Sequence, residues 1–445
     1  MGFEFRDSSG RVCGSTEFAK SLLADQLKQI DGELATSIRA ETNWRKNYQH
    51  YFYELTRLEV IRPDVNWSKF TDALASRITN DAGESLSNLA ARGFANRNDI
   101  KFVRVVGTGQ RKLIELPQEA SALTEHQATL DALRALDFVR ANAALDISGD
   151  ILVALAGYAE LSASKAWLDW GGTVTVIARR NDAAHSELLA HAKQSAGTLL
   201  FVEGGIDLVS EVEKAGHFLR TVSREGKRIV VASFGYAGGA NQIKLQAAQL
   251  ALTQVALQLP KAQVALAWLA TPLDVIVTDA QTAESQIASY RNRGLGTRLR
   301  DAFWQTFGSL VPCAPEVIDG DVGIFDASSN RQGSSYILAK HSERWAAMAA
   351  VRAGVRISFV VAPPAETQSV LGAKRVLTRT YKGLARFGVR PLGAKATATL
   401  MAAVLVRSLH DPAAPQSTSA TAIHAGLWRL PYRVDSIWVP ASLLG

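Results

Sequence analysis

The chain has 445 residues, 47% of them hydrophobic, which is enough for one large core or two to three smaller ones and too many for a disordered protein. Its net charge of +7 comes without a dense basic run, so we expect no nucleic-acid partner. Cys13 and Cys313 form no metal-binding motif; we expect no metal and a reduced, cytoplasmic setting.

The start of the chain lacks the basic and apolar segments of a signal peptide. The longest apolar run, 397–406, is shorter than the roughly 18 residues that span a bilayer. We therefore expect no integral membrane segment, and any membrane contact would be peripheral.

Residues 1–149 predict a mainly helical N-terminal region, because apolar residues recur at spacings of three and four in 15–41 and 126–145. The aromatic-rich stretch 44–58 predicts a packed helix interface or an oligomer contact in preference to a ligand site. No catalytic motif is visible in this region.

From residue 150 to residue 371, short apolar runs alternate with amphipathic helices, which is typical of successive βα units. The runs are 151–157, 173–179, 198–204, 228–235, 264–271 and 355–363. They predict an α/β fold with a doubly wound, parallel, Rossmann-like sheet that binds a nucleotide.

An insertion, 272–335, follows the fifth run. It predicts helices, a loop and a single strand-like segment, IVTDA, and we expect it to cover the carboxyl edge of the sheet as a lid without extending the sheet. Residues 372–445 predict a helical and extended C-terminal cap, with a helix near 393–411 and a tail rich in Trp and Pro.

The turn after the first strand is the candidate phosphate-binding loop. Gly157 can supply a tight turn there, whereas Glu160 and Ser162 stand where further glycines would ease the approach of a pyrophosphate. A plain βα turn remains the alternative at this position.

The second strand ends in Arg179 and Arg180, where an NAD site would place a carboxylate. A guanidinium suits a 2′-phosphate, so the pair favours NADP, although two surface charges would look the same.

Tyr336 and Lys340 stand four residues apart on a predicted helix and therefore share one face. Alone, such a pair is equally typical of an ordinary amphipathic helix. The pair lies between the insertion and the sixth strand, and this position favours a functional role.

Over residues 150–370 this order of parts resembles the short-chain dehydrogenase/reductase superfamily. The family carries a Tyr-x-x-x-Lys helix after its fifth strand, which the segment YILAK at 336–340 matches. The resemblance also implies that Pro363, Pro364 and Thr367 contact a nicotinamide, and that Asp207, after the third strand, contacts an adenine.

The serine of that family is missing from its usual place. Thr271, which ends the fifth strand, or Ser328 or Ser329 would then hold the substrate oxygen. The ammonium of Lys340 would lower the pKa of Tyr336 from its ordinary value of about 10, and Tyr336 would pass a proton to or from the substrate.

The resemblance implies an NADP(H)-dependent oxidoreductase that interconverts a carbonyl and an alcohol on a bulky, partly apolar small molecule. Whether the chain forms a homo-oligomer stays open. The alternative hypothesis is a non-catalytic Rossmann-like scaffold that has lost part of its phosphate loop and binds a partner.

Overall fold

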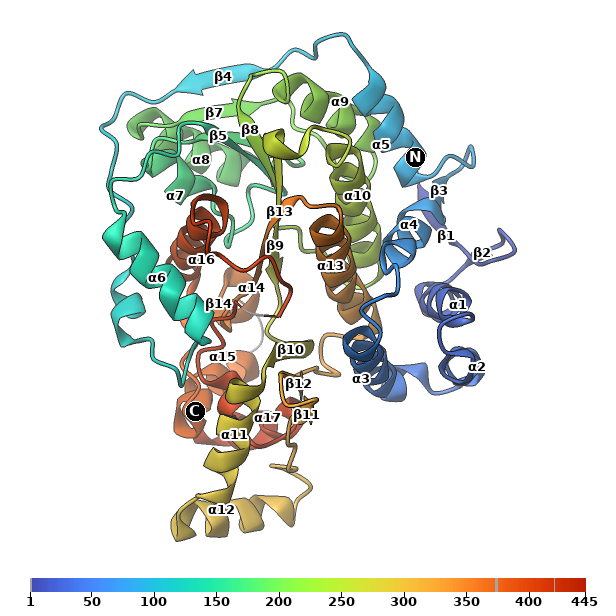
Figure 1. The fold of residues 1–445 in the computed structure, drawn as a ribbon, viewed down its shortest axis with the longest axis vertical. Helices are drawn as coiled ribbons and strands as arrows, with labels where there is room; N and C mark the ends of the chain where they lie inside the picture. The colour runs from blue at the N-terminus through green and yellow to red at the C-terminus, as the bar shows by residue number, and fades with distance from the viewer. Residues whose placement is uncertain (1, 373–374, 420) are drawn as a thin grey trace.

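The computed structural model describes residues 2–372, 375–419 and 421–445. At its centre is a seven-stranded sheet of order β13-β9-β8-β5-β6-β7-β4, parallel except at β4 (Figure 1). The strands are β4 (Val103–Val106), β5 (Asp150–Leu155), β6 (Thr173–Ile177), β7 (Thr198–Phe201), β8 (Arg228–Ser233), β9 (Val264–Ala270) and β13 (Arg356–Val361). The six parallel strands coincide with the six predicted runs, and their order is that of a doubly wound Rossmann sheet, so the predicted fold class is confirmed.

Both faces of this sheet are buried, which explains why its strands are continuous apolar runs. In β5, Ile151, Val153 and Leu155 belong to one core, while Leu152 and Ala154 belong to the core on the opposite face. The side-chain period of two thus divides one strand between two layers of helices.

Helices cover each face. One layer is α9 (Val212–Val222), α10 (Ala240–Ala256) and α13 (Ser334–Arg352); the other is α7 (Ser164–Asp169), α8 (Asp182–Gln194) and α16 (Ala394–His410), with α6 (Leu130–Ala141) outside α16. The helix expected at 393–411 therefore forms part of one helical layer of the central α/β core.

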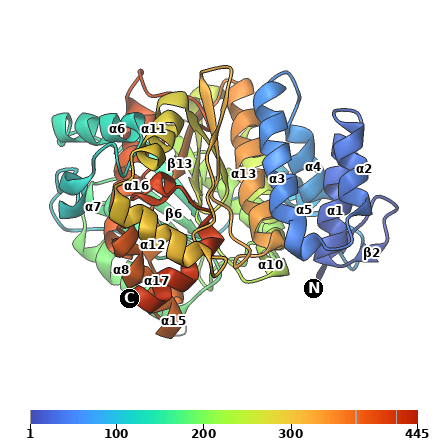
Figure 2. The same cartoon turned by 90° about the horizontal axis from the view of Figure 1, so that it is seen from below.

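The N-terminal region packs against the first of these layers (Figures 1 and 2). This part contains α1 (Ser15–Leu27), α2 (Gly32–Ala40), α3 (Trp44–Ile61), α4 (Ser68–Ser76), α5 (Leu86–Ala95) and a small sheet of β1 (Phe3–Arg6), β2 (Val12–Cys13) and β3 (Ile78–Asn80). The turn η1 (Gln118–Ala122) instead joins the core between α6 and α16 through Ala120. The aromatic stretch forms α3, whose Trp44, Tyr48 and Phe52 are buried in the shared core. Through β4, this region also supplies the antiparallel edge strand of the main sheet.

The insertion forms a separate antiparallel sheet of order β10-β12-β11 and adds no strand to the main sheet, as predicted. Its elements are β10 (Val275–Asp279), α11 (Ala280–Arg291), α12 (Leu295–Gln305), β11 (Glu316–Ile318) and β12 (Val322–Asp326). The expectation of a loop and a single strand was wrong for β11 and β12. These short strands depend on partners distant in the sequence, since β12 pairs with β10 and β11 pairs with β12. α11 packs so closely that a Cβ at Gly323 would lie 2.5 Å from the Cβ of Ala283.

The C-terminal segments close over the carboxyl edge of the sheet (Figure 2). They comprise β14 (Ala365–Glu366), α14 (Gln368–Leu371), α15 (Arg375–Leu384), β15 (Leu392–Gly393), α17 (Trp438–Leu444) and the turns η3 (Ala385–Phe387), η4 (Leu427–Arg429) and η5 (Val434–Ser436); η2 (Lys261–Gln263) precedes β9.

A buried carboxylate ties α3 to α13. The oxygens of Glu59 lie 2.8 Å from Nε2 of His341 and 3.4 Å from Arg344, and accept a hydrogen bond of 2.5 Å from the indole of Trp345. Glu59, His341 and Arg344 are each at most 4% exposed. Burial of the Glu59 carboxyl is outweighed by these partners, which hold its pKa below the ordinary value.

We expect Glu59→Ala to lower the free energy of unfolding by about 3–5 kcal/mol, because it leaves the buried Arg344 without its counter-charge and leaves His341 with Asp274 alone. Chemical denaturation followed by circular dichroism measures the loss. Glu33→Ala, an exposed position on α2, is the matched control and should change stability by less than about 0.5 kcal/mol. Equal stability of the two variants would contradict the assignment.

Candidate functional site

One cavity of about 1110 Å³ lies along the carboxyl edge of the main sheet. Its walls come from the segments that follow β5, β6, β7, β8, β9 and β13, from α13, and from the C-terminal cap. It therefore crosses the point between β5 and β8 where the strand order reverses, which is where open α/β sheets bind ligands. The volume is at the upper end of the usual range for ligand sites.

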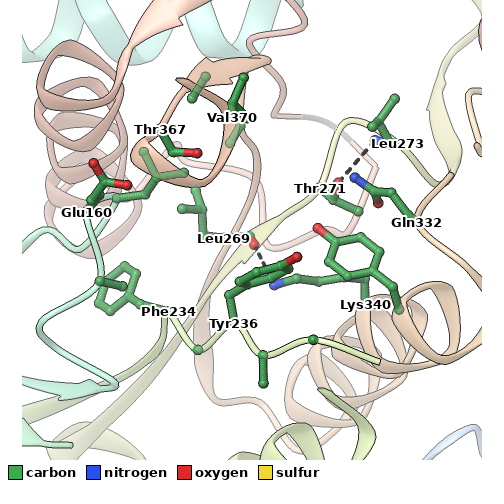
Figure 3. A pocket seen from close by; sticks show the side chains of 18 of the residues that line it. Glu160, Phe234, Tyr236, Leu269, Thr271, Leu273, Gln332, Lys340, Thr367 and Val370 are labelled. Atoms are coloured by element: carbon green, nitrogen blue, oxygen red, sulfur yellow. Dashed lines mark hydrogen bonds between the residues drawn. The ribbon is translucent and has the colours of Figure 1, made fainter. Parts of the chain in front are cut away.

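Tyr336 and Lys340 both line this cavity from the first turns of α13. Nζ of Lys340 donates to Oε1 of Glu343 at 2.9 Å and to the carbonyl of Leu269, at the end of β9, at 3.4 Å (Figure 3). Lys340 is 8% exposed and Glu343 is fully buried. The lysine is thus fixed by a buried ion pair one turn further along its own helix.

Burial raises the pKa of Tyr336, although Lys340 and a hydrogen bond with Thr271 lower it in part. The net shift is opposite to the one expected from the Tyr-Lys pair alone, because burial and the Glu343 carboxylate together offset the lysine. Burial also raises the pKa of Glu343 to about 7, against the attraction of Lys340. The pKa of Lys340 is raised as well: burial opposes its charge, but Glu343 and Tyr336 favour it more strongly.

Of the three candidate hydroxyls, Thr271 is the one beside Tyr336. It lines the cavity at the end of β9, and its Oγ1 accepts from the backbone N–H of Leu273 at 3.2 Å (Figure 3). Ser329 also lines the cavity, but its hydroxyl donates to Asp435 at 2.6 Å. Ser328 lies outside the lining and donates to Asp326 at 2.5 Å.

The turn after β5 differs in detail from the expected glycine turn. Ala156, not Gly157, has the positive φ, 61°, which is uncommon for a residue with a side chain and costs of order 1 kcal/mol or more. Gly157 serves close packing instead, since a Cβ there would lie 2.9 Å from that of Ala154. Gly157 and Ser162 are both outside the cavity lining, and the Ser162 hydroxyl is 2.7 Å from that of Ser164.

Glu160 lines the cavity and points toward the segment after β13 (Figure 3). Its Oε2 accepts the backbone N–H of Gln368 at 2.8 Å, which joins the β5 turn to the start of α14. Thr367 and Pro364, from that same segment, line the cavity. A carboxylate therefore occupies the place expected for a pyrophosphate.

Arg179 and Arg180, the two arginines after β6, have different surroundings. Arg179 lines the cavity with an exposed side chain. Burial opposes the charge of Asp207, but hydrogen bonds from Ser210 and from the backbone N–H of Val209, with a smaller contribution from the charge of Arg179, hold its pKa below the ordinary value. Arg180 is outside the lining and pairs with Asp182 at 2.6 Å. Asp207 lies in the lining, as expected for a group near an adenosine.

Sequence reasoning missed three parts of this site. Tyr236, in the loop after β8, lies edge-on to Tyr336 with ring centroids 6.1 Å apart and is 65% exposed. Glu343 was visible in principle, because it follows Lys340 by three residues on the same helix face. The apolar end of the cavity comes from the C-terminal cap and had no local signal; its side chains are Leu377, Tyr381, Leu384, Leu427, Ile437 and Trp438.

Neither a metal-holding cluster nor a membrane-spanning helix is present in the described part of the chain. Residues 2–372, 375–419 and 421–445 contain no group of three or more His, Cys, Asp or Glu side chains placed to hold a metal ion. No helix in the same residues combines the length and the apolar character needed to cross a membrane.

No family model and no curated protein sequence matches the chain. Solved structures similar to it include a short-chain dehydrogenase/reductase from Serratia marcescens, with 11% identity and a TM-score of 0.38 over 64% of this chain and 100% of that one. A short-chain type dehydrogenase/reductase from Mycobacterium ulcerans has 11% identity and a TM-score of 0.38 over 65% and 92%. L-sorbose reductase from Gluconobacter frateurii, complexed with NADPH and L-sorbose, has 11% identity and a TM-score of 0.39 over 64% and 98%. These structures come from the family that the sequence resembles; the chemistry of the site is inferred from its own geometry.

We expect the stability contributed by His341 to fall as the pH rises. Burial opposes its charge, but Glu59 and Asp274 raise the pKa of His341 to about 9. Because this value lies above the ordinary one of 6.5, the stabilisation is complete below about pH 6.5 and is lost as the pH rises through about 9. The free energy of unfolding of the parent minus that of His341→Gln should therefore decrease over this interval. His50→Gln, an exposed position on α3, is the control, and a pH-independent difference for His341 would refute the assignment.

Proposed function

We propose that this chain is an NADP(H)-dependent oxidoreductase that interconverts a carbonyl and an alcohol, with Tyr336 as the proton donor and acceptor. One observation carries the proposal: Tyr336, Lys340 and Thr271 meet in a single cavity at the switch point of a doubly wound sheet. A helical pair with no role in catalysis would have no reason to lie at this edge together with a third polar group.

In this proposal Tyr336 acts mainly as an acid. Because burial raises its pKa, its hydroxyl keeps its proton at neutral pH and can give it to a carbonyl oxygen. A bound nicotinamide would supply the hydride to the carbonyl carbon, so that the product is an alcohol. Thr271 would hold the substrate oxygen beside Tyr336, and the Lys340 ammonium would favour negative charge that develops on the phenolic oxygen.

The residues at the two ends of the cavity fit a dinucleotide. Arg179 and Asp207 would hold the adenosine end, with Arg179 against a 2′-phosphate, and Lys340 and Pro364 would lie beside the nicotinamide ribose and ring. The middle fits less well, because the Glu160 carboxylate would face the pyrophosphate. Glu160 is exposed, so its side chain can turn away once its hydrogen bond to Gln368 breaks.

The apolar end of the cavity supports a bulky, partly apolar substrate. Tyr381 and Trp438 face the same cavity as Tyr336, together with leucine side chains of the C-terminal cap. An apolar group of the substrate would displace water from this wall, while its carbonyl reaches the polar end.

The position of Glu160 favours a second candidate, a Rossmann-like scaffold that no longer binds a dinucleotide. Titration of the purified chain with NADPH, followed by cofactor fluorescence, separates the two. The oxidoreductase hypothesis expects saturable binding that becomes tighter in Glu160→Gln, because one negative charge is removed next to the pyrophosphate. No binding by either protein would favour the scaffold.

We expect Tyr336→Phe to lower turnover on an identified carbonyl substrate by a hundredfold or more, since the transferable proton is lost while the ring remains. NADPH affinity and thermal stability should stay close to those of the parent. Tyr381→Phe, which changes a second cavity tyrosine, is the matched control and should retain most of the activity. Full activity of Tyr336→Phe would show that another group moves the proton.

We expect Arg179→Ala to weaken NADPH binding by about tenfold and to leave NADH binding little changed, because one exposed charge-assisted contact to a 2′-phosphate is worth on the order of 1.4 kcal/mol. Arg180→Ala is the matched control: its guanidinium already pairs with Asp182 outside the cavity, so neither affinity should change. Titration of both cofactors decides the question, and equal NADPH and NADH affinities in the parent would refute the preference.

A further inference from the structure

The insertion carries an apolar ridge on α12 that no other part of the described chain covers. Leu295, Leu299, Phe303 and Phe307 recur every four residues and are 74%, 63%, 58% and 68% exposed. Leu295, Leu299 and Phe303 are four apart and share one face of α12. Phe307, in the turn just after the helix, continues the ridge because its ring centroid lies 5.3 Å from that of Phe303. Scattered exposed apolar residues are ordinary, but a contiguous set marks an interaction surface.

The ridge stands out from the body of the protein. Figure 1 shows α12 at the far end of the insertion. Within α12 only Asp301 is buried among the described side chains, where it pairs with Arg293 and Arg300 and accepts from Tyr432. After α12 the chain is joined to the start of α17 through the N–H of Leu310, which donates to the carbonyl of Ser436 at 3.0 Å. α17 adds exposed Val439 and Leu443 at 51% and 63%.

The surroundings of the ridge are basic. The stretch 289–312 contains four arginines and one acidic residue, the buried Asp301, and the stretch 377–392 of the neighbouring cap contains four basic residues and no acidic one. Arg291 and Arg298, at the ridge, and Lys382, on α15, are exposed and have no ion-pair partner within 2–372, 375–419 and 421–445. Apolar side chains flanked by arginines are the pattern of a helix that lies in the interface of a bilayer.

We propose that α12, with the adjoining end of α17, docks this protein onto the surface of an anionic lipid membrane. The Leu and Phe side chains enter the boundary between headgroups and acyl chains, and the arginines contact the lipid phosphates. This proposal is independent of the cavity and of its proposed chemistry.

Two other occupants fit the ridge less well. A second copy of the chain would bring the same arginines together, and a ridge one helix wide and roughly 16 Å long covers far less than the roughly 800 Å² that each partner buries in a stable dimer. A partner protein would have to offer a groove that is both apolar and acidic, because exposed arginines accompany the apolar side chains; an anionic bilayer presents both features together.

The test uses the full chain and sedimentation with vesicles of phosphatidylcholine alone or mixed with phosphatidylglycerol. We expect binding to the mixed vesicles only, and weaker binding as salt increases. The double variant Leu299→Ser/Phe303→Ser should lower the bound fraction tenfold or more, and Arg291→Gln and Arg298→Gln about fivefold each. Leu113→Ser and Arg134→Gln, exposed positions outside the insertion and the C-terminal cap, are the matched controls and should bind like the parent.

Several outcomes would overturn the proposal. One is no binding to the mixed vesicles, and another is an equal loss in the control variants. Binding that needs the arginines but not Leu299 and Phe303 would indicate an acidic macromolecule in place of a bilayer. A dimer that becomes a monomer in Leu299→Ser/Phe303→Ser, with no vesicle binding by the parent, would assign the ridge to a second copy. NADPH titration of the same variants monitors the cavity separately.

Discussion

Charged side chains buried along one helix, α13, set the conditions for the rest of this structure. Lys340 pairs with Glu343 on the side of the cavity, and His341 and Arg344 pair with Glu59 on the side of the N-terminal helices. Each of these groups loses its water on folding, so each depends on a partner held at one distance and angle. The Lys340–Glu343 pair lies within α13 and moves with it, but α13 cannot shift relative to α3 without separating His341 and Arg344 from Glu59. The position of Tyr336 follows from that restriction.

The same burial decides what the tyrosine can do. In an open site, a neighbouring lysine would make Tyr336 a better base; here Glu343 offsets the lysine and low solvent access favours the neutral phenol. An acid that is protonated at neutral pH suits the addition of hydride to a carbonyl better than the reverse reaction. The N-terminal helices, which carry no catalytic motif, would contribute to the proposed chemistry, because Glu59 holds the helix on which Tyr336 stands.

Charged side chains of both signs line the cavity. Arg179, Lys340 and the Glu160 carboxylate all line it. An anionic ligand would be attracted to the two cations and repelled by Glu160, unless that side chain moves. The hydrogen bond that Glu160 accepts from the N–H of Gln368 joins the β5 turn to the segment after β13. The C-terminal cap then closes the cavity with apolar side chains on its inner side, while its outer neighbour α12 turns apolar side chains to solvent.

The local sequence alone determined the six parallel strands, the helices between them and the shared face of Tyr336 and Lys340, because these features repeat within a few residues and need no distant partner. Tertiary structure decided the rest. Glu59 and His341 are 282 residues apart. β12 forms by pairing with β10, and β11 forms by pairing with β12. α16 covers the edge of the sheet because it packs against β13. The sequence does not distinguish Arg179 from Arg180. In the folded chain Arg179 lines the cavity, whereas Arg180 pairs with Asp182 outside it. Thr271 likewise differs from Ser328 and Ser329 only in which hydrogen-bond partners surround each hydroxyl in the folded chain. Such choices depend on long-range packing, which no local pattern records.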